Sequence, residues 1–333
     1  MGHFLSVGKR SCWALTASYG LLVLISLIDP ARLWAQSRPL QATSGASRGS
    51  YDLADVVKLS LFGHTDPATF TPLRLSDIGH GWLQPWIAPP NGSSGALRGG
   101  WVNTFSGFFS RELDPTYSFT SATSGGRNEH VGAVTYLTPL SRRLQLGLDI
   151  PFVDSLASGS GSNQSDTSFG DIVITPQVML QETQDLSLSL GVGVRTPTGE
   201  TKTGNGVTAV NPFVAFWSDL GAKWQARGGI GANVFTNRHG NNTLPDSEFL
   251  ANLALGATLS DHELAPLGDF TPYVSLNLIQ NIGNGPDTTT FSATPGIRTY
   301  LGWSTYFISG IVVPVTHPKP FDWQLTSIVS VGW

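Results

Sequence analysis

Short segments of alternating apolar and polar residues run through the chain from residue 101 to its last residue. Side chains of a β-strand point to opposite faces at every second position, so this alternation predicts strands with one apolar and one polar face. Leu144, Leu146 and Leu148, for example, oppose Gln145 and Gly147. The same pattern returns in LSLSLGVGV, which begins at residue 186, and in FLANLALGA, which begins at residue 249.

Twelve such segments are separated by turn-forming residues, and each is predicted to be one strand. They cover residues 101–110, 128–138, 143–154, 169–181, 185–197, 208–217, 223–236, 247–259, 270–282, 288–301, 304–316 and 321–333. In the final segment Trp333, Val331 and Val329 share one face, and Ser330 and Thr326 share the other. An amphipathic last strand that ends on an aromatic residue is typical of the closing strand of bacterial outer-membrane barrels, although a strand of a soluble sandwich alternates in the same way.

The connections between the predicted strands differ in length. Those at 111–127, 155–168, 198–207 and 237–246 are long, and those at 139–142, 182–184, 218–222 and 302–303 are short. Short turns at one end and longer loops at the other are typical of outer-membrane barrels, and an even strand number puts both termini at the short-turn, periplasmic end. Two connections break this rule, since 260–269 is long and 283–287 is short.

The N-terminal region precedes the predicted strands. Lys9 and Arg10 stand before an apolar run from Cys12 to Ile28, which predicts a secretion signal over residues 1–35; a transmembrane anchor is the alternative. Residues 36–100 form an extension, with one short helix expected at 52–62 and loops after it. We expect this extension in the periplasm or inside the barrel as a partial plug, and an ordered surface segment without a role is the alternative.

Composition supports a membrane barrel. Only 13% of the residues are charged, against ~25% in an average soluble domain, yet the mean hydropathy is +0.02. A lipid-facing outside combined with a lumen of small polar residues gives this balance. Tryptophans and tyrosines near the strand ends are expected in the aromatic girdles at the membrane interfaces, namely Trp224, Tyr273, Trp303, Tyr306, Trp323 and Trp333. Together with the strand pattern this composition predicts an all-β fold, a transmembrane antiparallel up-and-down β-barrel of about twelve strands over residues 101–333.

Charged residues on the polar faces are the candidates for lining the lumen. By strand parity they are Asp149, Asp171, Arg195, Arg227 and Arg298. Asp171 and Arg195 lie near the same end of neighbouring strands and can pair. Two interpretations stay open: a charged constriction that filters solutes, or buried pairs that hold the lumen together.

Catalytic and cofactor signals are weak. The chain has no HExxH zinc motif and no phosphate-binding loop, and we expect no catalytic residues, metal or cofactor. Gly191-Val-Gly193 and Gly229-Ile-Gly231 resemble the start of a dinucleotide fingerprint but lack its third glycine. We interpret them as strand glycines that relieve crowding inside the barrel.

One stretch carries a family resemblance. Ser168-Phe-Gly-Asp171-Ile, followed by LSLSLGVGV and Arg195-Thr-Pro-Thr-Gly199, resembles the outer-membrane transporters of the phenol-degradation meta-pathway (MetA-like) family. The resemblance extends from about Arg143 to Trp333 and leaves out the extension. It implies a channel that admits aromatic or other hydrophobic compounds.

These observations predict a monomeric channel of the bacterial outer membrane for passive transport of small, aromatic or hydrophobic solutes. Its expected partners are membrane lipid and a small-molecule solute, with no nucleic acid. The alternatives are a structural or adhesive barrel without transport and, further away, an outer-membrane hydrolase.

Overall fold

The computed structural model describes residues 51–123, 126–157, 165–203, 205–237, 244–283 and 288–333. All of them belong to one unit, residues 47–333. The predicted secretion signal and the leader up to residue 50 lie outside the described residues. Within these ranges, no helix has the length and apolar character needed to cross a bilayer.

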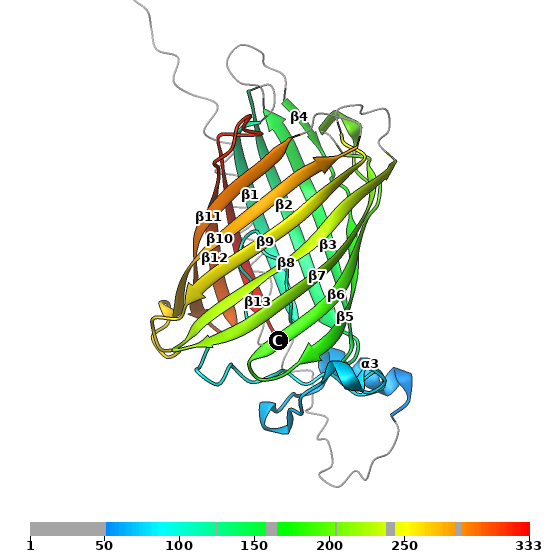
Figure 1. Cartoon of the computed structure of the whole chain (residues 1–333), viewed down its shortest axis with the longest axis vertical. Helices are drawn as coiled ribbons and strands as arrows, with labels where there is room; N and C mark the ends of the chain where they lie inside the picture. Colours follow the sequence, from blue (N-terminus) through cyan, green and yellow to red (C-terminus); the bar gives the residue numbers. More distant parts are fainter. Residues whose placement is uncertain (1–50, 124–125, 158–164, 204, 238–243, 284–287) are drawn as a thin grey trace, which may run out of the picture. The chain divides into compact units, whose positions relative to one another are not determined.

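Twelve antiparallel strands close into a barrel (Figure 1). They are β1 (Glu112–Thr123), β2 (Arg127–Pro139), β3 (Leu144–Ala157), β5 (Val173–Glu182), β6 (Leu186–Arg195), β7 (Thr208–Gly221), β8 (Trp224–Asn237), β9 (Ser247–Ala257), β10 (Gly268–Ile282), β11 (Thr289–Gly302), β12 (Thr305–Pro314) and β13 (Trp323–Gly332). Each strand pairs with the next one along the chain, and β1 pairs with β13 to close the wall. A short strand, β4 (Ser165–Ser168), pairs only with the last residues of β3. The predicted up-and-down barrel of twelve strands is confirmed.

The start of the barrel differs from the prediction. Residues 101–110 form no strand, and the first wall strand is β1, in a stretch predicted to be a loop. The barrel therefore begins at Glu112 and not at residue 101. The other eleven predicted strands correspond to wall strands, with ends that differ by a few residues. A short apolar run such as WVNTFSGFF has no feature that separates a wall strand from a segment packed inside the wall.

The two faces of the wall have opposite chemistry. Large apolar side chains are exposed on the outer face, among them Leu190, Ile230, Leu253, Leu255, Val274, Leu276, Ile297, Ile311 and Val313. Buried polar side chains line the inner face, among them Gln145, Gln177, Ser187, Ser189, Gln225, Thr271, Ser275, Thr294 and Thr326. The alternation predicted from the sequence is thus present, with its apolar side turned outward.

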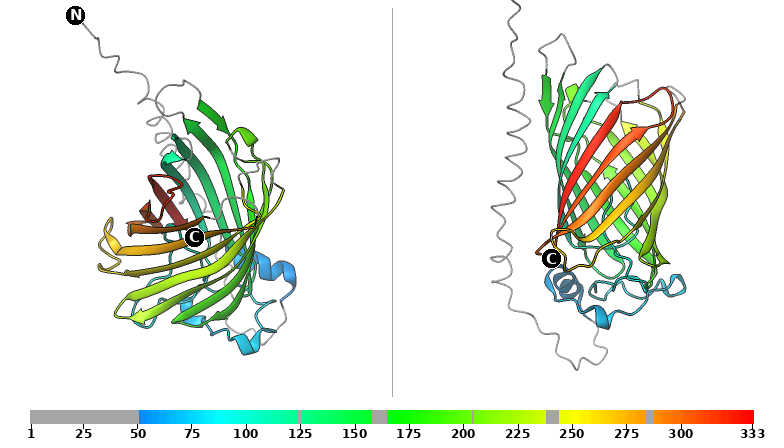
Figure 2. Two further views of the ribbon diagram at one scale, coloured as in Figure 1. Left: turned by 45° about the horizontal axis from the view of Figure 1, so that its top comes forward. Right: turned by 90° about the vertical axis from the view of Figure 1, so that its left-hand side faces the viewer.

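Both ends of the wall meet at one rim, where Glu112 pairs with Gly332. We call this rim the terminal end and the opposite rim the far end. The C-terminus and helix α3 (Leu53–Phe62) lie at the terminal end (Figure 2). Two turns at this end have two residues each with left-handed φ angles, 50° and 62° at Ala222 and Lys223 and 50° and 55° at Trp303 and Ser304. Such turns match the twist of paired strands and fix their register.

The extension folds against the terminal end. The predicted helix at 52–62 is confirmed as α3, and the short helices η1 (Pro67–Thr69) and η2 (Leu75–Asp77) follow it. Arg111 donates to the carbonyls of Leu59, Ser60 and Gly63 at the end of α3. Arg143 donates to carbonyls of both the extension and the wall, those of Arg74, Asp77, His80, Met179 and Leu180. Arg142 also donates to Thr71 Oγ1 (2.8 Å), so three arginines fasten the extension to the barrel.

Candidate functional site

Residues 96–111, which we call the lumen loop, enter the barrel from the terminal end and return to it at Glu112. Near the tip, Asn103 accepts a hydrogen bond at its carbonyl from Ser275 Oγ (3.0 Å) and donates from Nδ2 to Thr294 Oγ1 (3.3 Å). On the return path Ser110 N donates to Gln145 Oε1 (2.9 Å). The part of the chain inside the lumen is therefore the end of the predicted extension together with the wrongly predicted first strand.

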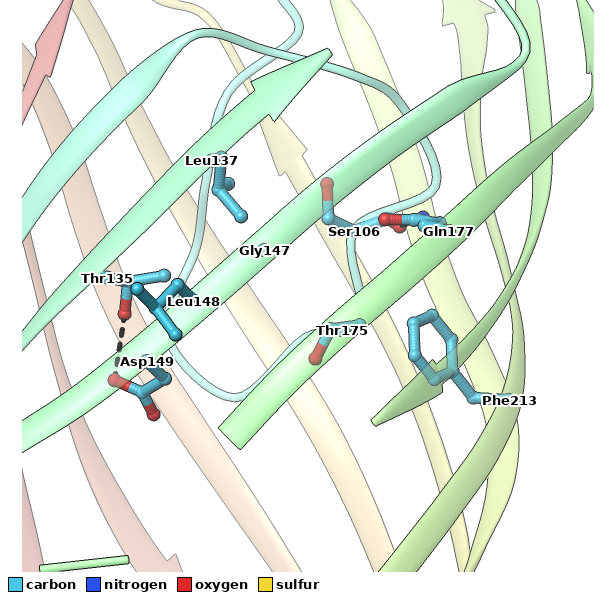
Figure 3. A pocket seen from close by; sticks show the side chains of 9 residues that line it. All are labelled: Ser106, Thr135, Leu137, Gly147, Leu148, Asp149, Thr175, Gln177 and Phe213. Carbon is cyan, nitrogen blue, oxygen red and sulfur yellow. Dashed lines mark hydrogen bonds between the residues drawn. The ribbon is translucent and has the colours of Figure 1, made fainter. Parts of the chain in front are cut away.

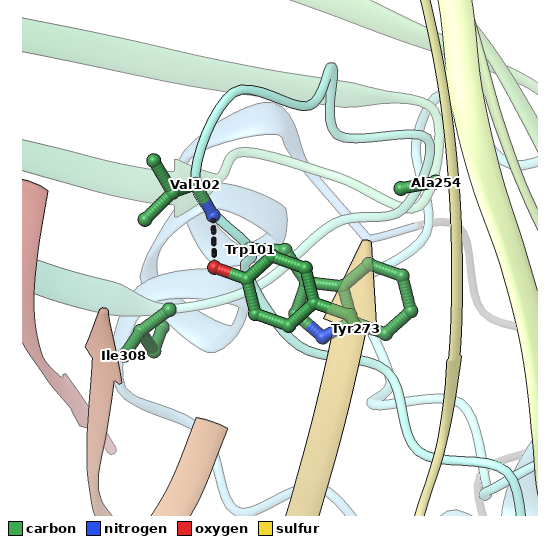
Figure 4. Packing of buried hydrophobic residues seen from close by; sticks show 5 residues of the cluster. All are labelled: Trp101, Val102, Ala254, Tyr273 and Ile308. Carbon is green, nitrogen blue, oxygen red and sulfur yellow. Dashed lines mark hydrogen bonds between the residues drawn. The ribbon is translucent and has the colours of Figure 1, made fainter. Parts of the chain in front are cut away.

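Aromatic rings fix the lumen loop to the wall (Figure 4). Trp101 stacks on Tyr273 with ring centres 4.8 Å apart, and the Tyr273 hydroxyl accepts from Val102 N (3.0 Å). Phe105 stacks on Phe213 at 4.9 Å. Such stacked pairs contribute about 0.5–1.5 kcal/mol each beyond the area they bury. The loop is thus a packed element and not a loose strand connection.

Glycines of the wall make room for these rings. A Cβ added at Gly256 would lie 2.7 Å from the Trp101 ring, and one at Gly229 would lie 2.9 Å from the Phe105 ring. At Gly191 an added Cβ would collide with the ring of Phe213. The interpretation of the paired glycines as strand positions that relieve crowding is confirmed at Gly191 and Gly229, and their role is to admit aromatic side chains into the lumen.

Two of the five predicted lumen charges, Arg227 and Arg298, lie against the lumen loop. Arg227 donates to the carbonyls of Gly99 and Phe105, the latter at 3.3 Å. The guanidinium of Arg298 lies 3.6 Å from the centre of the Tyr306 ring and beside Gly99. Both side chains are buried. Both arginines therefore hold the lumen loop against the wall.

A third arginine, which the sequence interpretation missed, belongs to the loop itself. Arg98 lies 4.4 Å from the centre of the Trp217 ring, donates to the carbonyl of Thr183 and lies 3.7 Å from Glu182. Burial lowers the pKa of Arg98 to about 10, and the nearby carboxylates oppose this effect. The guanidinium therefore stays charged at neutral pH and can hold the loop.

Asp171 and Arg195 form the predicted pair at the far end. Arg195 Nε donates to Asp171 Oδ2 at 2.8 Å. The same carboxylate accepts from the backbone N–H groups of Gly199 (2.8 Å), Gly206 (2.8 Å) and Val207 (3.0 Å). All of its acceptor positions are therefore used in folding the β6–β7 connection over the rim.

The surroundings of Asp171 favour its ionised form. Burial alone would raise its pKa, but the three backbone N–H groups and Arg195 outweigh burial and hold the pKa of Asp171 below its usual value. The carboxylate is therefore ionised at neutral pH. This arrangement resembles a structural clamp more than a passage for ions.

Asp149 has a different environment (Figure 3). It borders a cavity of about 130 Å³ whose walls come from β2, β3, β5, β7 and the loop residue Ser106. Thr135 Oγ1 donates to Asp149 Oδ1 (3.2 Å). Ser106 also accepts at its carbonyl from Gln177 Nε2 (2.6 Å), so the tip of the lumen loop is part of the cavity wall.

The five predicted residues thus fall into three groups, and their role in filtering solutes stays a prediction. Asp171 and Arg195 are together, Arg227 and Arg298 meet the lumen loop near Gly99, and Asp149 stands apart at the cavity. Among the described residues, no group of three His, Cys, Asp or Glu side chains could hold a metal ion.

Several important lumen residues were missed. Tyr273 and Tyr306, predicted in the outer aromatic girdle, face inward, where Tyr306 donates to Asp269 Oδ2 (2.9 Å). The predicted girdle residues Trp224, Trp303, Trp323 and Trp333 are exposed. A signal was available for Tyr273, because it shares its strand parity with Ser275 and Asn277 and not with Val274 and Leu276.

A comparison with known protein families identifies the family of this chain. The model of the family described as "Putative MetA-pathway of phenol degradation" matches residues 102–305, more than half of the chain. The chain belongs to this family. The match begins earlier than the resemblance seen in the sequence, and it includes most of the lumen loop but not the extension before it.

Solved barrels are similar in fold. The COG4313 outer membrane channel from Pseudomonas putida F1 shares 12% identity, with 68% of this chain and 96% of that chain covered and a TM-score of 0.50. A KdgM porin shares 6% identity over 67% of this chain and 99% of its own, with a TM-score of 0.43. The translocator domain of autotransporter NalP from Neisseria meningitidis shares 11% over 67% and 86%, with a TM-score of 0.42. No curated protein sequence matches the chain.

Proposed function

We propose that the protein is a channel of the bacterial outer membrane that admits small aromatic or other hydrophobic solutes by passive diffusion. Membership of the family and the barrel fold support this function. In the membrane, the apolar outer face of the barrel contacts lipid. The terminal end with its short turns faces the periplasm, and the far end faces the cell exterior.

The observation that carries the proposal is the way the lumen loop is attached. Among the described residues, no backbone–backbone hydrogen bond joins residues 97–110 to the wall, and the loop is held by side chains such as Trp101, Arg98 and Arg227. Every wall strand has its own ladder on both sides. The loop can therefore leave the lumen without breaking the barrel, and it acts as the channel's constriction.

A disulfide that locks the loop tests this function. A Cβ added at Gly310 of β12 would lie 3.2 Å from Val102 Cβ, close to the separation of about 3.5–4.5 Å that a disulfide needs. The chain's single cysteine, Cys12, lies in the predicted signal. After removal of this signal, the two introduced cysteines are the only thiols of the mature protein. We therefore expect the double variant Val102→Cys, Gly310→Cys to conduct when reduced and to become silent when oxidised, in planar bilayers and in liposome swelling with small solutes.

The single variants Val102→Cys and Gly310→Cys serve as controls, because neither can form the bond and both should be insensitive to oxidant. Unchanged conductance in the oxidised double variant would show that the loop does not have to move. Silence of the wild-type protein and of all variants would exclude passive conduction.

One observation favours a second function, a structural or adhesive barrel without transport. Buried aromatic side chains of the lumen loop, Trp101 and Phe108, fill part of the lumen as a core would. For such a barrel, the reduced and oxidised double variants and the wild type would all be silent while remaining folded.

A further inference from the structure

Asp149 is the one predicted lumen carboxylate that has no arginine beside it, whereas Asp171 is paired with Arg195. In the part of the chain that the structure describes, Asp149 forms no salt bridge, and the one side chain that donates to it is Thr135. Figure 3 shows its second carboxylate oxygen directed away from Thr135. That oxygen can accept a hydrogen bond from a molecule inside the barrel.

The cavity beside Asp149 has the size of a small ring compound. Its volume is about 130 Å³, and an engineered protein cavity of about 150 Å³ holds one benzene molecule. Leu137 and Phe213 give it apolar walls, whereas Thr175 and Gln177 add polar groups. A single six-membered ring with one short substituent matches this space.

We propose that this cavity, the Asp149 site, selects solutes by charge: it binds a single-ring compound that carries one hydrogen-bond donor, neutral or cationic, and disfavours carboxylate anions. The proposal rests on the proposed channel function and narrows its solute class. A donor gains a charge-assisted hydrogen bond to the carboxylate oxygen that points away from Thr135. A carboxylate anion has no donor to offer and is repelled by the ionised form of Asp149.

The Asp149 site lies next to the lumen loop, so a solute bound there can affect whether the channel opens. Ser106 at the tip of the lumen loop lines the cavity and is held by Gln177. A bound solute therefore touches the element that must move before the solute can continue toward the terminal end. The site that selects solutes by charge is therefore in contact with the loop whose movement opens the channel.

Three compounds of equal ring size separate the charge effect from the size effect: benzylammonium, benzyl alcohol and benzoate. Their binding to the detergent-solubilised full-length mature protein is measured by saturation-transfer NMR. We expect benzylammonium and benzyl alcohol to bind and benzoate to bind at least about tenfold more weakly, as expected for a hydrogen bond to a charged group. In Asp149→Asn, affinity for benzylammonium should fall about tenfold and the preference over benzoate should disappear.

Asp261→Asn is the matched control, because it removes one carboxylate from an exposed turn outside the lumen and should keep the wild-type preference. A second variant, Thr175→Met, fills the cavity without changing any charge and should weaken all three compounds. Heat-modifiable gel migration verifies that each variant is folded. An Asp149→Asn protein that keeps the wild-type preference overturns the proposal, as does a Thr175→Met protein with unchanged binding.

Binding is measured without transport, so the two proposals fail separately. A protein that binds the compounds as expected but stays silent in bilayers supports the Asp149 site and contradicts the channel. A protein that conducts but shows no preference between benzylammonium and benzoate keeps the channel and overturns the site.

Discussion

At the scale of single residues, the family motif is a folding device. Thr198 Oγ1 donates to the carbonyl of Gly170 (3.2 Å) and accepts from Ile172 N (2.8 Å), next to the Asp171–Arg195 pair. The two separated pieces of sequence that resemble the family therefore meet at the far end of the barrel. Of the two interpretations of the lumen charges, the one in which charges hold the structure together fits this pair better.

Replacement of Arg195 tests that interpretation. Arg195→Gln should lower the free energy of unfolding by about 1–3 kcal/mol, because Asp171 keeps its backbone donors but loses its cation. Solute flux in liposomes should not change. The side chain of Arg195 is 33% exposed and that of Asp171 1%, so solvent reduces the effect on one partner only.

The exposed pair of Lys223 and Asp261 is the control for urea unfolding of Arg195→Gln. Its side chains are 42% and 76% exposed, and Asp261→Asn should change the free energy of unfolding by less than about 1 kcal/mol. A changed flux at unchanged stability in Arg195→Gln would instead favour the solute filter.

The pKa of Asp171 makes a separate prediction about pH. Its pKa is lowered in the folded protein, so its ionised form stabilises the fold at every pH above its unfolded value of about 4, and this stabilisation is lost as the pH falls through the lower, folded pKa. The stability difference between wild type and Asp171→Asn should therefore be constant near neutral pH and shrink in acid. Urea titrations at a series of pH values measure it, and a difference that grows in acid would contradict the assignment.

At the scale of elements, the lumen loop depends on Trp101, whose side chain is 5% exposed. Trp101→Ala removes the stack on Tyr273 and leaves a space beside Gly256, at a cost of about 3–5 kcal/mol to the packing of the loop. Because the loop has no strand pairing, we expect the barrel to remain folded and its conductance in planar bilayers to rise.

Trp303→Ala is the matched control for Trp101→Ala, since Trp303 is 89% exposed in the β11–β12 turn. It should leave conductance at the wild-type level. A loss of folding in Trp101→Ala would mean that the loop is part of the barrel's core and not a removable constriction.

At the scale of the whole molecule, the apolar outer face predicts that an arginine placed on it destabilises the barrel more, the deeper it lies in the membrane. Leu253, 47% exposed, lies within β9, and Leu259, 66% exposed, lies just beyond the end of that strand. Leu253→Arg should cost about 2–4 kcal/mol in lipid vesicles and Leu259→Arg about 0–1 kcal/mol. Urea unfolding in vesicles measures both, and equal costs would contradict a lipid-facing wall.

The wall and its two faces could be predicted from the order of residues along the chain. A period of two fixes which side chains share a face, and this held for Leu144 and Leu146, which are less buried than Gln145 between them, as well as for the inward charges Asp149 and Arg227. Helix α3 was also predicted, although the periodicity of its apolar residues is weak. These features depend on neighbouring residues alone.

What fills the barrel depends on contacts between residues that are far apart in the sequence. Residues 101–110 alternate like a strand and β1 carries Glu112, Asp114 and Pro115, so the local pattern favours the wrong segment for the wall. The choice depends on pairing with β13 and on the fit of Trp101 and Phe105 over distant glycines. For the same reason Asp149 could be assigned to the lumen from its sequence but not to a cavity, because a cavity exists only where several strands and the lumen loop meet.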